Sequence, residues 1–478
     1  MIKDSLMLTK EKSSAGFSIT VQIKIRNIPG SFARIVQIIA GTEASLAEVK
    51  LISSGFDYNI REVTIACKSE PHSHDIVKIL KNLDEAILLS WQDDTFEMHR
   101  GGKLNVSAKA PLNTTDELSR AYTPGVARVC THIHRDPESA YSYTIKGKCV
   151  AVVTDGSAVL GLGNIGPQAA MPVMEGKAML FKQFGDIDAF PICLDTQDTE
   201  EIIAAVKCIS PTFGGINLED ISAPRCFEIE ERLQKELEIP IFHDDQHGTA
   251  VVVLAGLINA LKIVGKKISD INVVVNGFGA GGVACTKLMM LAGVKNVIAC
   301  DTAGIVFNGR QENMNSVKEE LARITNLENR KGNLADALKG ADVFIGVSQP
   351  GVVTAADIKN MAKDPIVFAL ANPVPEILPV EIKGIARIVA TGRSDYANQV
   401  NNVLCFPGLF KGALSCRARE ITANMKIAAA HAIAESIQEN ELKEESIIPG
   451  VFAAGVADCV AQRVKEAAIN DGVASLRL

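Results

Sequence analysis

Several features are scarce in this 478-residue sequence, and each scarcity excludes a class of protein. The eleven cysteines include no CxxC pair, and an odd number cannot all pair within one chain. We therefore expect reduced thiols rather than a disulfide scaffold. There is no long basic run and the net charge is −7, so we expect no nucleic-acid partner. The longest apolar run, near residues 250–258, is far shorter than the roughly 20 residues of a membrane span.

The N-terminal segment is charged and polar and has no apolar stretch typical of a secretory signal. These observations together predict a cytoplasmic protein that does not enter a membrane. With 47% apolar and 22% charged residues, the chain can bury several cores, and its length predicts two to four domains of about 100–200 residues each.

The first hundred residues follow a pattern of their own. Strand-like segments at 17–25, 46–52, 59–67 and 86–91 alternate with helical ones, the first capped by Ser31 and the second at about 73–83. This βαββαβ order predicts a ferredoxin-like fold. The turn Asn27–Gly30 resembles the ligand-binding turn of ACT regulatory domains, although a plain dimerisation or packing module would have the same pattern. We expect about the first 15 residues to be disordered, and residues 93–109 to form a polar linker.

Acidic residues follow apolar, strand-like segments between residues 148 and 248. The segments 149–153, 215–217 and 239–242 lead to Asp155, to Glu219 and Asp220, and to Asp244 and Asp245. The carboxyl ends of parallel strands meet at one edge of a sheet, so we expect these acids to converge. Carboxylates in one crevice repel one another unless a cation lies between them, and oxygen ligands favour Mg²⁺ or Mn²⁺.

Two histidines offer a competing metal site. His243 and His247 have the spacing of zinc ligands on a helix, but we expect the end of a strand there, not a helical turn. We therefore favour the carboxylates as ligands. Lys177 lies in an apolar helical segment, where it either extends to the surface or faces the cation, which would lower its pKa and make it a base.

The segment 271–301 predicts a dinucleotide site. A strand leads into Gly277, Gly279 and Gly282, a helix follows, and a second strand ends at Asp301. The glycines allow a tight turn and close approach of a pyrophosphate to the helix N-terminus. Asp301 would accept hydrogen bonds from the adenosine ribose, and because Thr302 supplies no cation to bind a 2′-phosphate, we predict NAD over NADP. Three more strands, ending near Ser348, Asn372 and Arg393, extend this sheet.

Taken together, long segments of the chain resemble malic enzymes of the prokaryotic type. The matching segments are SRAYTPGVA, VTDGSAVLGLGNIGPQAAMPVMEGKA, INLEDISAP, FHDDQHGTA, FALANPVPE and ATGRSDYANQVNNVLCFPG, in this order from residue 119 to residue 408. The resemblance extends from about Leu104 to the C-terminus and implies NAD-dependent oxidative decarboxylation of (S)-malate to pyruvate and CO₂ with Mg²⁺ or Mn²⁺. The N-terminal ACT-like domain would be an addition that suggests allosteric regulation.

The resemblance also implies a role for each site residue. Lys177 would be the base, with Asp244 adjusting its charge, and Tyr122 would be the acid that protonates C3. The metal ligands would be Glu219, Asp220 and Asp245. Asn372 and Asn402 would hold the substrate carboxylate together with Tyr122 and Lys177. Cofactor contacts would come from Gly277, Gly279, Ala280, Gly282, Asp301, Ser348 and Asn372. One position departs from the larger animal enzymes, whose carboxylate-binding arginine is replaced here by Ala158; Arg120 or loop amides are candidates for its role.

The predicted architecture is α/β, and it divides the chain into four parts. An ACT-like domain covers residues 1–97, a substrate and metal domain 98–262, and a Rossmann-type NAD domain 263–410. C-terminal helices at 411–478 would pack back on the substrate domain. We expect a homodimer or higher homo-oligomer, malate as substrate and a possible small-molecule effector. The alternatives are a malolactic enzyme, which keeps its NAD bound and releases lactate, and a catalytically silent sensor.

Overall fold

The computed structural model describes residues 13–159 and 161–476, and the chain forms two compact units, 1–105 and 106–478. The disorder predicted for the N-terminus concerns residues 1–12, which lie outside the described residues, whereas Ser14 already belongs to a strand. The first unit contains β1 (Ser14–Arg26), α1 (Ser31–Gly41), β2 (Ser45–Ser54), β3 (Tyr58–Cys67), α2 (Glu70–Lys81), β4 (Ala86–Asp93) and α3 (Asp94–His99).

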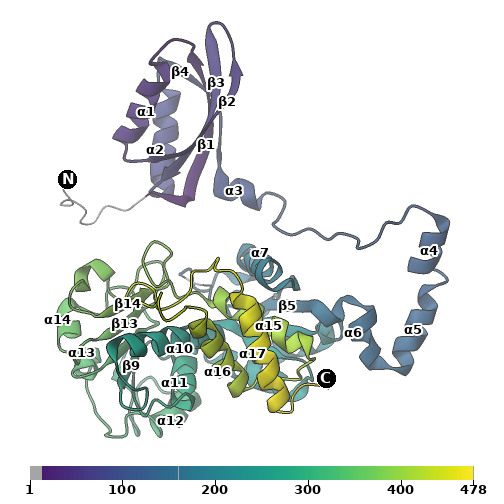
Figure 1. Cartoon of the computed structure of the whole chain (residues 1–478), viewed down its shortest axis with the longest axis vertical. Coiled ribbons are helices and arrows are strands. Elements are labelled where there is room, and N and C mark those ends of the chain that lie inside the picture. Colours follow the sequence, from purple (N-terminus) through teal and green to yellow (C-terminus); the bar gives the residue numbers. More distant parts are fainter. Residues whose placement is uncertain (1–12, 160, 477–478) are drawn as a thin grey trace. The chain divides into compact units, whose positions relative to one another are not determined.

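The predicted βαββαβ order of the first unit is confirmed (Figure 1). Its antiparallel sheet has the order β2-β3-β1-β4. Alternate residues of β1, from Ile19 to Ile25, are buried with residues of α1 and α2 in one apolar core, as the period of a half-buried strand requires. Two details differ from the prediction. Gly30, not Ser31, caps α1, and the expected linker begins with helix α3, because Asp93 accepts hydrogen bonds from the backbone of Thr95 and Phe96.

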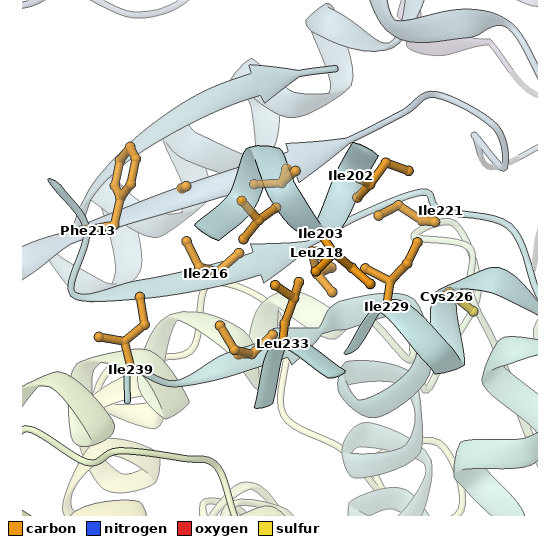
Figure 2. Packing of buried hydrophobic residues seen from close by; sticks show 14 of the residues in the cluster. Ile202, Ile203, Phe213, Ile216, Leu218, Ile221, Cys226, Ile229, Leu233 and Ile239 are labelled. Carbon is orange, nitrogen blue, oxygen red and sulfur yellow. The ribbon is translucent and has the colours of Figure 1, made fainter. Parts of the chain in front are cut away.

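The second unit begins with short helices and a parallel sheet of order β6-β5-β7-β8. Its elements are α4 (Thr115–Ala121), α5 (Val126–Arg135), α6 (Ala140–Tyr143), β5 (Cys149–Thr154), α7 (Gly166–Gly185), β6 (Asp188–Cys193), α8 (Thr199–Ile209), β7 (Gly215–Leu218), α9 (Arg225–Glu236), β8 (Ile241–His243) and α10 (Asp244–Val264). Side chains of β7, α8 and α9 interlock in one core beside this sheet (Figure 2).

A six-stranded sheet follows, with the order β11-β10-β9-β12-β13-β14. Its elements are β9 (Asn272–Asn276), α11 (Ala280–Leu291), β10 (Asn296–Asp301), β11 (Gly304–Ile305), α12 (Ser316–Ala322), α13 (Leu334–Leu338), β12 (Val343–Gly346), α14 (Ala355–Lys359), β13 (Ile366–Ala369) and β14 (Ile388–Thr391). All pairs are parallel except β10 with β11. The chain leaves β10 and returns on the other side of β9, so a ligand crevice is expected outside the ends of β9 and β12.

Three helices close the second unit: α15 (Phe406–Ser415), α16 (Ala423–Glu435) and α17 (Val456–Asn470). Helix α15 packs against α7, and α16 packs against α10. By length and composition alone, α10 could cross a membrane, but two thirds of its apolar window is buried inside the unit. We therefore describe α10 as a core helix, to which the apolar run noted in the sequence belongs.

Candidate active site

Three carboxylates gather where β7 ends and α10 begins. One ligand oxygen from each of Glu219, Asp220 and Asp245 lies within 4.8 Å of the other two. The backbone N–H of Asp220 donates to Asp245 Oδ2 over 2.8 Å, while Asp220 Oδ2 is buried with no hydrogen-bond partner among the described residues. An unpaired buried carboxylate oxygen beside two further carboxylates suits a hard divalent cation. The geometry therefore fits the predicted metal ligands.

The electrostatics of this cluster point the same way. Burial, followed by the neighbouring Asp245, raises the pKa of Asp220 to about 8. Burial also raises the pKa of Glu219 well above its usual value, although Lys177 opposes this shift. Each carboxylate is thus unfavourable as a lone buried charge, and a bound cation would offset that cost.

Lys177 extends from the middle of α7 into this cluster and not to the surface. Its Nζ lies 2.5 Å from Asp244 Oδ2 and 2.9 Å from Glu219 Oε1, above the ring of Phe406. Burial alone would lower the pKa of Lys177, but the two carboxylates raise it above the usual range. Of the two alternatives for Lys177, the structure shows the buried one, in which Nζ faces the carboxylates, and its pKa is raised by them and not lowered.

Asp244 connects the lysine to one of the predicted substrate residues. Its Oδ2 also accepts a hydrogen bond from Asn402 Nδ2 over 3.0 Å. The side chain of Asn372 packs against Gly392, and Asn372 precedes a cis peptide bond to Pro373. No hydrogen bond among the described residues joins Asn372 to Lys177 or to the carboxylates.

The two histidines do not form a metal site with each other. The expected strand end is confirmed, because β8 ends at His243. The expectation that no helical turn follows was wrong, because α10 begins at Asp244 and places His247 in its first turns. The acids suit this position, since carboxylates are stabilised at a helix N-terminus. His247 Nε2 contacts Glu230 Oε2 over 2.9 Å and His243 is fully buried, so both serve the packing behind the carboxylates.

Tyr122 is placed apart from the other predicted catalytic residues. It caps α4, and its side chain is 68% exposed. Among the described residues, no side chain of α4 or α5 is buried, and no hydrogen bond links the Tyr122 hydroxyl to Lys177. The structure of a single chain therefore brings together Lys177, Asp244 and the three carboxylates, but not the proposed acid.

A cavity of about 780 Å³ lies outside the ends of β9, β10 and β12. Gly277, with φ +99°, and Gly279 line it, and a Cβ on Gly282 would meet the carbonyl oxygen of Gly277 at 2.1 Å. The turn at Gly277 and the helix position Gly282 therefore both need glycine, as the glycine spacing in the sequence predicted. Ala280 begins α11, and Ser348 lines the cavity with its N–H bonded to Glu376.

The cofactor turn adjoins the carboxylate cluster. A Cβ on Gly281 would lie 3.4 Å from the carbonyl oxygen of Asp245, and α10 packs along α11. The glycine turn therefore lies beside the backbone of Asp245, one of the three clustered carboxylates.

Several functional positions were missed from the sequence. Arg310 and Lys318 pair with Asp301, whereas the sequence indicated only that the neighbouring Thr302 supplies no cation. Arg225 forms an ion pair with Asp155. Glu230 accepts a hydrogen bond from the N–H of His243, the residue directly before α10. None of these residues stands in a recognisable motif, since each meets its partner only through the fold.

Comparisons with known proteins agree with this arrangement. The family model for the malic enzyme N-terminal domain matches residues 101–234, and the model for the malic enzyme NAD-binding domain matches residues 246–469. The NAD-dependent malic enzyme of Geobacillus stearothermophilus is 56% identical over 96% of both chains. The bifunctional malic/malolactic enzyme of Bacillus subtilis is 54% identical over 81% of this chain and 95% of its own.

A solved structure shows the same fold. The malic enzyme of Pyrococcus horikoshii superimposes with a TM-score of 0.78 at 52% identity, covering 80% of this chain and 92% of its own. The matched segments contain Glu219, Asp220, Lys177 and the glycine turn of an NAD-binding domain, and Asp245 lies directly before the second segment. The chain therefore belongs to the malic enzyme family.

Proposed function

We propose that the protein oxidises (S)-malate with NAD and releases pyruvate and CO₂. The observation that carries this proposal is the position of Lys177, whose ammonium lies between Asp244 and the carboxylate cluster beside the cofactor turn. The test is to incubate the protein with (S)-malate, Mn²⁺ and NAD⁺ and to follow NADH and pyruvate. NADH and pyruvate formed in equal amounts would support the proposal. If neither NADH nor pyruvate is formed, the proposal is refuted.

The divalent ion is proposed to bind Glu219, Asp220 and Asp245. The support is the unpaired, buried Asp220 Oδ2 within an all-oxygen donor set. When bound, NAD accepts a hydride and the ion polarises the C2 oxygen of malate. Titration with Mn²⁺, followed by electron paramagnetic resonance, tests the site directly. The variant Asp220→Asn should bind Mn²⁺ much more weakly than the unmodified protein, and equal binding would exclude these ligands.

Lys177 is proposed to take the proton of the C2 hydroxyl. Its Nζ is held by Asp244, which Asn402 in turn orients, so the amine has a fixed direction toward the cluster. A cation bound by Glu219 would compete with Lys177 for that carboxylate and repel the ammonium. Both effects lower the Lys177 pKa toward that of a base. We further propose that the substrate is contacted by Asn372 and Asn402. The cofactor would be contacted by Ser348, Asp301 and the glycine turn.

Tyr122 is proposed to be the acid that protonates C3. In this proposal the protein is a homodimer, and the Tyr122 of one subunit acts in the active site of the other. Two observations support this: Tyr122 is exposed at the end of α4, and neither α4 nor α5 buries a side chain among the described residues. Exposed apolar residues of this region are Leu112, Leu118, Val129, Tyr143 and Ile145. Packing against a second copy would remove that apolar surface from water.

A second candidate is malolactic turnover, in which NAD stays bound and lactate leaves. The name of the Bacillus subtilis relative, a bifunctional malic/malolactic enzyme, favours testing it. Lactate formed without free NADH would replace the first proposal by the second. NADH in step with pyruvate and no lactate would exclude malolactic turnover.

The first unit is proposed to be an ACT-like sensor that binds a small carboxylate. The protein is proposed to be cytoplasmic. The turn before α1 is fixed by Asn27, which donates to the Gly55 carbonyl over 2.7 Å and accepts from Asn59. The hydroxyl of Ser31 at the start of α1 is buried and has no partner among the described residues. Calorimetry of the whole protein with a panel of amino acids tests this. Saturable binding that Ser31→Ala weakens supports it, and absence of binding leaves a packing module instead.

A further inference from the structure

Glu376 is a fully buried carboxylate in the loop that follows β13. Its Oε1 accepts hydrogen bonds from the N–H of Ser348 over 2.7 Å and from the Ser348 hydroxyl over 3.0 Å. Its Oε2 accepts a third bond from the N–H of Ala371 over 3.0 Å. Both carboxylate oxygens are thus held, and the side chain connects the loop after β12 to the loop after β13.

Packing alone does not account for this carboxylate. The groups that bond it are two backbone N–H groups and one hydroxyl, and none of them carries a charge. Burial raises the pKa of Glu376, and these hydrogen bonds only partly offset that shift. A Cβ on Gly346 would lie 2.5 Å from Glu376 Cδ, so the end of β12 must be glycine to admit the carboxylate. A buried charge with such a cost is expected at a functional position.

The bonds of the Ser348 hydroxyl determine what it can offer to a ligand. A hydroxyl has one hydrogen to donate and two lone pairs that accept. Ser348 Oγ donates its hydrogen to Glu376 and accepts from Asn276 Nδ2 over 2.8 Å. One lone pair remains, and Ser348 lines the cavity of about 780 Å³ beside Asn276 and Gly277. Ser348 can therefore accept a hydrogen bond from a ligand in this cavity but cannot donate one.

We propose that Glu376 is a positioning residue for the dinucleotide. It fixes the Ser348 hydroxyl as a hydrogen-bond acceptor, which binds a donor group of NAD, either the carboxamide N–H or a ribose hydroxyl. The bond from Ala371 keeps the carboxylate from turning away. The inference rests on the proposed malate oxidation only where turnover is measured, because binding of NAD⁺ is measured without malate.

Calorimetry with NAD⁺ tests the acceptor. Ser348→Ala removes the hydroxyl but keeps the backbone N–H that Glu376 binds. Because a lost hydrogen bond corresponds to about tenfold in affinity, NAD⁺ should bind about tenfold more weakly. Unchanged affinity would overturn the proposal. An NAD⁺ analogue with an acetyl group in place of the carboxamide separates the two donors. With this analogue, the effect of Ser348→Ala persists if the donor is a ribose hydroxyl and disappears if it is the amide.

Glu376→Gln tests the positioning role. The amide has nearly the size of the carboxylate but only one acceptor oxygen, so it cannot accept from both Ser348 and Ala371. We expect the KM for NAD⁺ to rise about tenfold while the KM for (S)-malate changes little. A loss of folded protein would instead lower kcat and leave both KM values unchanged. Glu381→Gln, an exposed acid shortly after Glu376, is the matched control and should not change the KM for NAD⁺.

The double variant shows whether Glu376 acts through Ser348. If it does, Ser348→Ala should weaken NAD⁺ binding little further in the Glu376→Gln protein. Independent, additive losses would overturn the proposal. Should Glu376→Gln fail to fold, Glu376→Asp, which keeps two acceptor oxygens but shifts them, takes its place in the same comparison. Absence of turnover in the unmodified protein refutes the proposed function, whereas the binding measurements still decide the role of Glu376.

Discussion

At the scale of single residues, the candidate site depends on charges that are buried together. Lys177 has little exposed surface, and Asp244 is fully buried. Removing one partner of a buried ion pair leaves an uncompensated charge, which costs more than the pair contributes. A conservative substitution here will therefore affect both chemistry and stability, and the two must be measured separately.

Lys177→Ala tests the proposed base. Because a positioned general base contributes about a hundredfold to ten-thousandfold, we expect kcat to fall by about that amount. NAD binding should persist, since the glycine turn lies at the start of α11 and Lys177 lies on α7. Steady-state kinetics and calorimetry with NAD⁺ give the two readouts. Near-normal kcat would remove Lys177 from the mechanism.

Arg225 is a positioning residue for the carboxylate cluster. Its Nη2 donates to Asp155 Oδ2, Ser157 Oγ and Ser222 Oγ over 3.0–3.1 Å, and Ser157 Oγ accepts from the N–H of Ser222. These bonds tie the turn after β5 to the turn that follows Glu219 and Asp220. Arg225 also stands near Ala158, whose N–H donates to the Asp220 carbonyl over 2.9 Å.

Arg225→Met should therefore weaken Mn²⁺ binding and lower the free energy of unfolding by about 2 kcal/mol. Arg225→Lys should restore part of the Mn²⁺ affinity. Arg232→Met is the matched control, because Arg232 lies on the same helix and pairs with the exposed Glu200; such pairs contribute about 0–1 kcal/mol. Spectroscopic Mn²⁺ titration and chemical denaturation measure both effects. If Arg225→Met and Arg232→Met bind Mn²⁺ equally, Arg225 does not position the ligands.

At the scale of elements, α10 links the carboxylate cluster to the core. It starts directly after β8, so its first turn presents Asp244 and Asp245, and its later turns are buried. This helix start was not recognised in the sequence, because an acidic pair after an apolar strand has the same pattern whether a loop or a helix follows. The strands themselves were predicted well, since four- to six-residue apolar segments with Gly or Asp at their ends are typical of parallel sheets.

Gly248→Ala tests how closely α10 determines the position of Asp244. A Cβ on Gly248 would lie 1.9 Å from Asp244 Oδ1, so the carboxylate that holds Lys177 and Asn402 through Oδ2 must shift. In a helix interior, Gly to Ala is otherwise favourable by about 1 kcal/mol. We therefore expect a loss of kcat without a comparable loss of stability.

Gly256→Ala is the control for this change. It lies on the same helix, where a Cβ would approach Phe368 at 3.0 Å, remote from Asp244. We expect it to alter the unfolding temperature more than kcat. If both variants keep full activity, the position of Asp244 is less restricted than its contacts indicate.

At the scale of the whole molecule, the sequence predicted residues that stand in motifs or at strand ends, and it missed residues that only the fold brings together. The glycine turn and Glu219 with Asp220 lie in continuous motifs, so their types and spacing were enough. Arg310 and Lys318 were missed because the turn that brings them back to Asp301 has no period and no motif. For Tyr122, the sequence predicts a role but contains no information about which subunit it serves.

A mixed dimer tests whether the active site is shared between subunits. We expect Tyr122→Phe and Lys177→Ala each to be nearly inactive alone, because each removes a proton-transfer group. If Tyr122 acts in the partner's site, a heterodimer of the two variants has one site with both defects and one intact site. Random pairing of equal amounts then restores about a quarter of the unmodified activity. Co-expression with two affinity tags isolates the heterodimer for assay. If Tyr122 serves its own subunit, every site carries one defect and no activity returns.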